Sequence, residues 1–112
     1  MAKYVILASY SDDAVAHMMS HPADRAASVS KLIEAAGGKM ESFHWMFGPY
    51  DALVIVDVPG PKALAACALA VISTHALKKF ESYELISHQE ISSIEEQARQ
   101  VRDSYAPPGE ER

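Results

Sequence analysis

Two segments of the sequence are apolar at every successive position, and this feature constrains the fold more than any other. They are residues 4–8 (Tyr-Val-Ile-Leu-Ala) and 52–56 (Ala-Leu-Val-Ile-Val). Segments this short and this rich in β-branched residues are typical of strands covered on both faces, because neighbouring side chains of a strand point in opposite directions. The sheet that contains them therefore needs a covering layer on each side.

The rest of the sequence divides into strand and helix patterns. Strands are predicted over residues 3–10, 39–47, 51–58 and 76–87, the last of them at an edge of the sheet because of its charges. Helices are predicted briefly after Ser11, over residues 22–36, after Pro61 and after Ser87. The helix after Pro61 is nearly uncharged, and we expect it to be well buried. A turn of roughly two to four residues should join the second and third strands.

This order of elements indicates an α+β fold. The succession β-α-β-β-α-β is that of the ferredoxin-like sandwich, in which two helices cover one face of a four-stranded antiparallel sheet. The other face needs a cover that the single chain does not supply. A second copy packed sheet to sheet is the economical answer, so we expect a homodimer or a higher homo-oligomer.

Composition and charge bound the class of protein. The chain has 112 residues, of which 49% are hydrophobic and 22% are charged, as in a folded domain. Its net charge is -5 and its basic residues are scattered, which argues against nucleic acid as a partner. Its apolar runs are too short for a membrane span, and its beginning has no signal-peptide layout, so we expect a cytoplasmic protein. We divide it into a domain over residues 1–87 and a C-terminal helix with a flexible tail over residues 88–112.

Three segments together resemble a known family. They are residues 3–10 (Lys-Tyr-Val-Ile-Leu-Ala-Ser-Tyr), 37–45 (Gly-Gly-Lys-Met-Glu-Ser-Phe-His-Trp) and 47–51 (Phe-Gly-Pro-Tyr-Asp). In this order they are similar to the GYD-domain proteins, over roughly residues 3–87. The resemblance implies a ferredoxin-like fold of the dimeric α/β-barrel kind, and it implies no established activity. The extension after Ser87 lies beyond the family-like region.

The best candidates for a binding site are polar residues beside the predicted turn. Gly48 would serve the backbone of the turn, while Tyr50 and Asp51 would either stabilise the turn or donate and accept protons at the rim of a pocket. His44 lies among apolar residues of its strand and is a further candidate. It should face away from Trp45, which we expect in the core or in a dimer interface with Phe43 and Phe47. Tyr10 completes the set of candidate ligand-binding residues, and no catalytic residue is assigned.

Metal and cofactor sites find little support in the sequence. Asp13, His17 and His21 stand four residues apart, but three ligands so spaced extend over more than about 10 Å of helix, and Pro22 should turn His21 away. We therefore predict no metal site. Cys67, the single cysteine, should be a small buried hydrophobe. No cofactor is predicted, although His75 leaves haem open.

These observations favour a small-molecule-binding, homo-oligomeric α/β barrel whose pocket lies between sheet and helices. Two alternatives stay open. One is a cofactor-independent monooxygenase or isomerase that uses the same pocket for proton transfer. The other is an oligomerisation or regulatory module without a ligand. Because unrelated functions share this fold, fold alone does not choose between them, and whether the protein is an enzyme stays open.

Overall fold

The computed structural model describes residues 1–111 and has one sheet with helices attached to it. Its elements are β1 (Ala2–Tyr10), α1 (Asp12–Ser20), α2 (Arg25–Ala35), β2 (Lys39–Trp45), β3 (Ala52–Val58), α3 (Pro61–Ile72), β4 (Leu77–Glu84) and α4 (Ile91–Val101). Short 3-10 turns at His88–Glu90 and Arg102–Ser104 flank α4.

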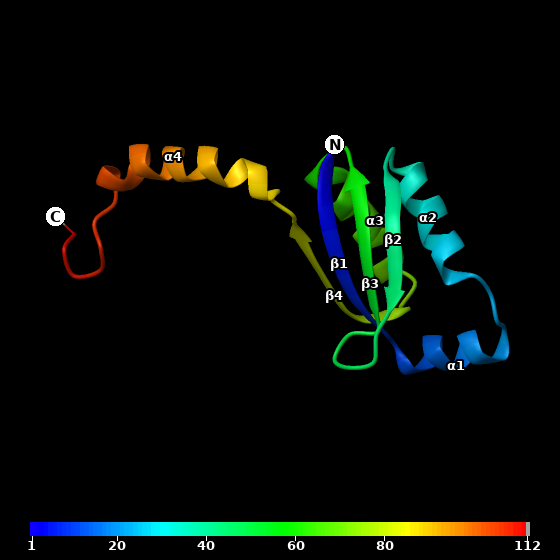
Figure 1. Cartoon of the computed structure of the whole chain (residues 1–112). Helices are drawn as coiled ribbons and strands as arrows, with labels where there is room; N and C mark the ends of the chain where they lie inside the picture. The colour runs from blue at the N-terminus through cyan, green and yellow to red at the C-terminus, as the bar shows by residue number, and fades with distance from the viewer. Residues whose placement is uncertain (112) are drawn as a thin grey trace.

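The sheet has the predicted ferredoxin-like arrangement. Its four strands are antiparallel and lie in the order β2-β3-β1-β4, so β4 is an edge strand as expected. Helices α2 and α3 lie behind the sheet in Figure 1 and cover one of its faces. The α+β class and the antiparallel sheet predicted from the order of elements are therefore confirmed.

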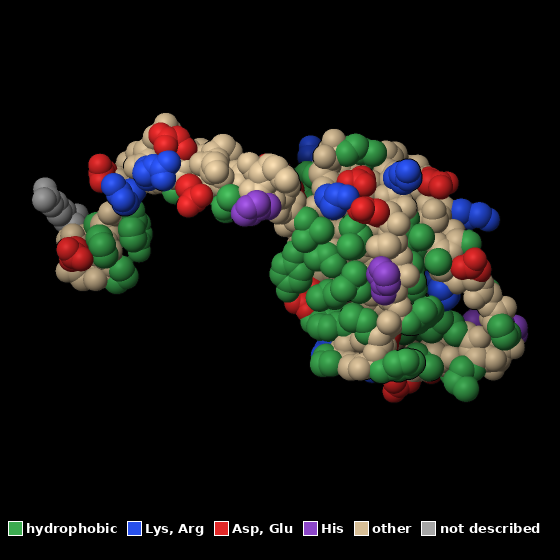
Figure 2. Space-filling model, in the orientation of Figure 1, with side chains coloured by type: hydrophobic (Ala, Val, Ile, Leu, Met, Phe, Trp, Pro, Cys, Tyr) green, Lys and Arg blue, Asp and Glu red, His purple; other side chains and the backbone are tan. Residues whose placement is uncertain are grey.

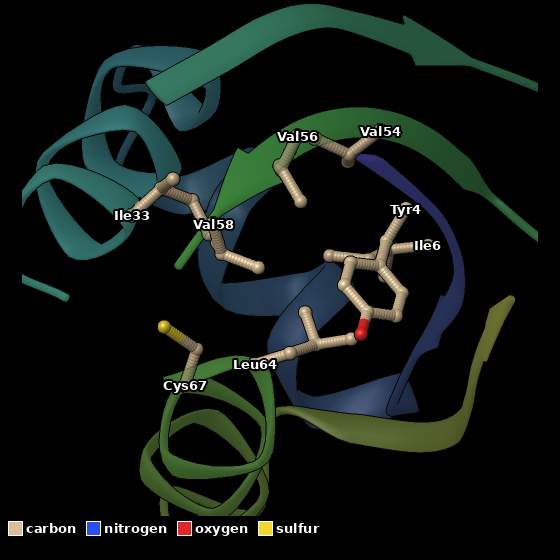
Figure 3. Close-up of a cluster of buried hydrophobic side chains, with 8 residues drawn as sticks. All are labelled: Tyr4, Ile6, Ile33, Val54, Val56, Val58, Leu64 and Cys67. Carbon is tan, nitrogen blue, oxygen red and sulfur yellow. The ribbon is translucent and has the colours of Figure 1, made fainter. Parts of the chain in front are cut away.

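The core lies between the sheet and these two helices. Alternate residues of β1 from Tyr4 and of β3 from Ala52 point toward the helices, and each of them is at most 7% exposed. The cluster consists of Tyr4, Ile6, Ile33, Val54, Val56, Val58, Leu64 and Cys67 (Figure 3). Ile33 comes from α2, while Leu64 and Cys67 come from α3, so one cluster joins both helices to the sheet.

The opposite face of the sheet is left open. It carries Val5 and Leu7 of β1 and Leu53 and Ile55 of β3, all of them partly exposed. Figure 2 shows hydrophobic side chains gathered over the sheet on this side. We call these four residues the open-face cluster. The cluster agrees with the apolar pattern of both strands. Helices α2 and α3 pack on the other face, so the expectation that a second copy covers this one stays a prediction.

Helix α2 is shorter than predicted. It begins at Arg25 rather than at Pro22, because the side chain of Asp24 accepts a hydrogen bond from the backbone N–H of Ala27 and caps the helix there. It ends at Ala35, one residue before the predicted end, and Gly37 follows it with a left-handed φ of 84°. Gly38 N–H then donates to the carbonyl of Ile33, which closes the C-terminal turn.

The hairpin between β2 and β3 also differs from the prediction. β2 ends at Trp45 rather than at residue 47, and β3 begins at Ala52. The connection 46–51 is therefore longer than the two to four residues expected. Gly48-Pro49 ends the strand pattern as predicted, but the irregular backbone begins before it.

The C-terminal part of the chain projects away from the sheet (Figure 1). All residues from Ser82 to Glu111 are exposed, and the longest dimension of the described chain is 61 Å. The predicted C-terminal helix is present as α4, preceded by a capping box between Ser87 and Glu90.

Helix α3, expected to be well buried, instead exposes a face that includes Leu69 and Ile72. Only Leu64 and Cys67 of this helix are buried, because the sheet covers a single side of it.

Candidate functional site

The loop 46–51 is fastened to the end of β1 by hydrogen bonds. Tyr10 N–H donates to Asp51 Oδ2 at 2.9 Å, and Asp51 N–H donates to the carbonyl of Ala8 at 2.8 Å. Ser9 Oγ donates to the carbonyl of Pro49 at 2.6 Å. Asp51 thus holds the loop against β1, which is the structural role weighed for it from the sequence.

Gly48 does not play the role predicted for it. Its φ is not left-handed, and a Cβ atom placed on it would meet nothing within 4 Å. The turn therefore does not require glycine for conformational reasons. The neighbouring Phe47 is fully exposed at the tip of the loop and is no part of the core.

Tyr10 lies where this loop meets the helices. It is the last residue of β1 and is only 6% exposed. Its ring is 5.8 Å from that of Trp45, and the guanidinium carbon of Arg25 is 5.8 Å from its centroid. Trp45 also packs edge-on against Phe43, but about half of its surface is exposed.

Three cavities surround Tyr10 at this end of the molecule. The first has a volume of about 430 Å³ and lies between α1 and the end of α3, with His17 and His75 in its wall. The second, of about 380 Å³, is lined by apolar residues of α1, by Trp45 and by Asp51. The third, of about 100 Å³, lies between the sheet and helices α2 and α3. Tyr10 and Arg25 line all three, so the cavities converge on this pair.

Arg25 is the one functional candidate that the sequence reasoning missed. Its Nε atom is buried and has no hydrogen-bond partner among residues 1–111. Unsatisfied buried polar atoms are uncommon in native proteins and call for an explanation. The sequence held one weak signal, since a basic residue directly after the N-cap Asp24 opposes the helix dipole. The position of Arg25 beside Tyr10 depends on tertiary packing.

The predicted site residues do not all lie together. Tyr10 and Asp51 meet at the cavities on the helix-covered side. His44 pairs with Leu53 across the strands and lies exposed on the open face, opposite in direction to Trp45 as expected. Tyr50 lines none of the three cavities, and its ring centroid is 5.6 Å from Lys79 Nζ. The structure therefore does not bring His44 and Tyr50 together with Tyr10.

The residues weighed as metal ligands do not form a metal-binding group in the described part of the chain. Among the residues described, no group of three or more His, Cys, Asp or Glu side chains is placed to hold a metal ion. His21 was expected to turn away from His17, but their rings stack with centroids 4.5 Å apart, because α1 continues to Ser20 before Pro22 intervenes. His75 is exposed in the wall of the 430 Å³ cavity.

Cys67 is buried as predicted, and burial raises the pKa of its thiol. It lies in the wall of the 100 Å³ cavity. None of the helices in residues 1–111 has the length and apolar character needed to cross a membrane.

Comparison with known proteins gives a family. No curated protein is significantly similar to this sequence. A solved structure of the Arabidopsis thaliana protein At3g17210 is similar at 20% sequence identity, over 78% of this chain and 95% of that one, with a TM-score of 0.45. The family model of the GYD domain matches residues 4–94, and so extends past Ser87 into α4, further than the resemblance first indicated. The chain therefore belongs to the GYD domain family.

Proposed function

We propose that this GYD-domain protein binds a small molecule in the cavities around Tyr10, and that it does so as a homo-oligomer. The observation that carries the proposal is the convergence of three cavities, of about 430, 380 and 100 Å³, on one buried tyrosine. Ligand sites are typically concave, largely apolar and supplied with few polar groups, and their volumes fall in the range of several hundred Å³.

The lining of the cavities supports binding by a partly apolar molecule. Met18, Met19 and Trp45 contribute apolar surface to the 380 Å³ cavity, and methionine side chains adapt readily to ligands of different shape. Tyr10 adds an aromatic ring. Asp51 supports binding more than proton transfer, because its Oδ2 atom already accepts the N–H of Tyr10. It shapes the wall of the cavity by holding the loop in place.

A second copy of the chain is part of the proposal. The open-face cluster consists of large aliphatic side chains in the middle of the sheet, and surrounding charges, such as the ion pair of Lys3 with Glu41, frame it at one end. An apolar centre with a polar rim is the usual composition of an interface. Two copies that meet at this face with twofold symmetry would cover both clusters at once. His44 would then lie inside the assembly.

The binding proposal is tested by filling the 430 Å³ cavity. Ala14 lines this cavity on α1, whereas Ala16 of the same helix is exposed and lines none of the three. We expect native mass spectrometry of the purified protein to find a retained small molecule, or one taken up from a mixed metabolite library. Ala14→Trp should reduce binding at least about tenfold, and Ala16→Trp should leave it unchanged. An absorption spectrum of the same sample reports any coloured cofactor.

The same mass spectra determine the oligomeric state. A homodimer is expected at micromolar concentration. A monomer would contradict the assembly, and a protein that neither retains nor takes up any small molecule would contradict the binding function. Equal effects of the two tryptophans would also contradict it, because they would show that the cavity is not where the ligand binds.

A further inference from the structure

The side chain of Arg25 has a hydrogen-bond donor that no other residue of the described chain pairs with. It lies at the first position of α2, packs over the ring of Tyr10 and lines all three cavities. Its Nε atom is buried without a hydrogen-bond partner in the described chain. A guanidinium group has five N–H donors in a planar fork, so besides the buried Nε–H the terminal N–H groups of Arg25 are the ones that can meet an acceptor in the cavities.

The charge of Arg25 is also not neutralised. Within residues 1–111 the ion pairs involve Lys3, Lys78 and Arg99, and Arg25 takes part in none. Burying part of an unpaired charge is unfavourable. The helix dipole adds partial positive charge at the start of α2, which the carboxylate of Asp24 at the N-cap offsets.

The nearby carboxylates do not neutralise the guanidinium group of Arg25. Asp24 uses Oδ1 to cap α2, and Asp51 uses Oδ2 to hold Tyr10. Asp13 lines the 430 Å³ cavity and is exposed. His17 and His75 line the same cavity. The cavities therefore offer an anion the guanidinium group of Arg25.

The walls next to Arg25 indicate what the anion is attached to. On one side are aliphatic and aromatic residues of the sheet, α2 and α3, including Ile6, Val29 and Phe80. On the other side are Met18 and Trp45. A fully hydrated inorganic anion would leave these apolar walls without a partner, whereas an organic acid would contact them.

We propose that Arg25 binds the acidic group of the ligand, and that the ligand is an organic carboxylate with an apolar body. The inference rests on the proposed function and names the chemical class that the cavity selects. A carboxylate matches the fork geometry of the guanidinium group and can accept two parallel hydrogen bonds from it. The apolar body lies along Tyr10, between the walls contributed by α1 and by the sheet.

Octanoate and 1-octanol are suitable probes, because they share an alkyl chain and differ in the carboxylate. Trp45, the single tryptophan, lines the adjoining cavity and reports binding by its fluorescence, which isothermal titration calorimetry can check. Octanoate should bind the protein at least about tenfold more tightly than 1-octanol, which is the size expected for a charge-assisted hydrogen bond. Its affinity should fall as sodium chloride is added, whereas that of 1-octanol should not.

The matched variants are Arg25→Met and Arg99→Met. Arg25→Met keeps an unbranched apolar side chain over Tyr10 and should remove the preference for octanoate while binding of 1-octanol persists. Arg99 lies on the projecting helix α4, so Arg99→Met removes one positive charge far from the cavity and should change nothing. Circular dichroism verifies that both variants are folded. The salt dependence tests the wild-type protein even if Arg25→Met does not fold.

Several outcomes would overturn the inference. Equal affinity of the two probes for the wild-type protein, or a preference for octanoate that survives in Arg25→Met, would show that Arg25 does not select an acid, while the cavity would still bind small molecules. An octanoate affinity insensitive to salt would count against it in the same way. Binding of neither probe would overturn both this inference and the site proposed for the ligand.

Discussion

The two faces of the sheet have nearly the same apolar composition and very different environments. Tyr4 and Val56 point to the covered face and are at most 6% exposed, whereas their sequence neighbours Val5 and Ile55 lie partly exposed on the open face. The covered face is packed by α2 and α3 from the same chain. The difference teaches that helices α2 and α3 cover only one of the two apolar faces of the sheet, and that the second copy proposed above would be needed to cover the other.

Charged substitutions at adjacent residues of β3 should show the largest difference between the two faces of the sheet. Val56→Asp places a carboxylate among fully buried side chains and should cost at least about 4 kcal/mol, enough to prevent folding. Ile55→Asp places it on the open face, where it remains hydrated in the monomer, so the variant should fold but fail to assemble. Circular dichroism and light scattering on a sizing column measure both effects. A folded Val56→Asp, or an unfolded Ile55→Asp monomer, would break the comparison.

Substitution of Gly38, next to the covered face, should lower the stability by less than a buried charge does. A Cβ atom on Gly38 would collide with the carbonyl oxygen of Asp57 and press on Val58 and Ile33, where α2 turns into β2. Gly38→Ala should therefore lower the free energy of unfolding by about 2–3 kcal/mol in urea titrations. Gly48→Ala, at the open loop tip, is the matched control and should change it by less than about 0.5 kcal/mol. Equal losses would mean that the loop tip is also constrained.

The thiol of Cys67 reports how well the covered side excludes solvent. Burial raises its pKa, so less thiolate is present at a given pH and alkylation should be slow. Iodoacetamide should react at least about tenfold more slowly with the folded protein than with the urea-unfolded chain at pH 8. The midpoint of the rate against pH should lie higher in the folded protein. Rapid alkylation of the native protein at pH 7 would show that the covered side opens readily.

Removing the projecting arm should have the smallest effect on the domain. Residues 88–111 are exposed throughout, and α4 points away from the sheet (Figure 1). Deletion from residue 88 onward should change the thermal stability of the remaining domain by less than about 1 kcal/mol, because almost no buried surface is lost. Differential scanning calorimetry of the truncated and full chains measures this. A large loss would show that the arm packs onto the domain, its own or a partner's, in solution.

The local elements were readable from the sequence because their signals are local. The doubly apolar segments predicted β1 and β3, and the cap at Ser11 predicted α1. The start of α2 was misplaced, since Pro22 and Asp24 compete as helix signals and the hydrogen bond of Asp24 to Ala27 decides between them. The candidate site was only partly readable: Tyr10 and Asp51 meet at the cavities, but Arg25 was not singled out.

By itself, the sequence determined the order of elements, the apolar character of both sheet faces and the family, because side-chain periodicity and turn chemistry act over a few residues. Only the tertiary structure decided which face α2 and α3 cover, how far α4 projects, and that the start of α2 brings Arg25 over Tyr10. The reason is physical: residues 10 and 25 are joined by a helix and a proline-containing turn, and the angle between those elements depends on packing against the sheet rather than on their own residues.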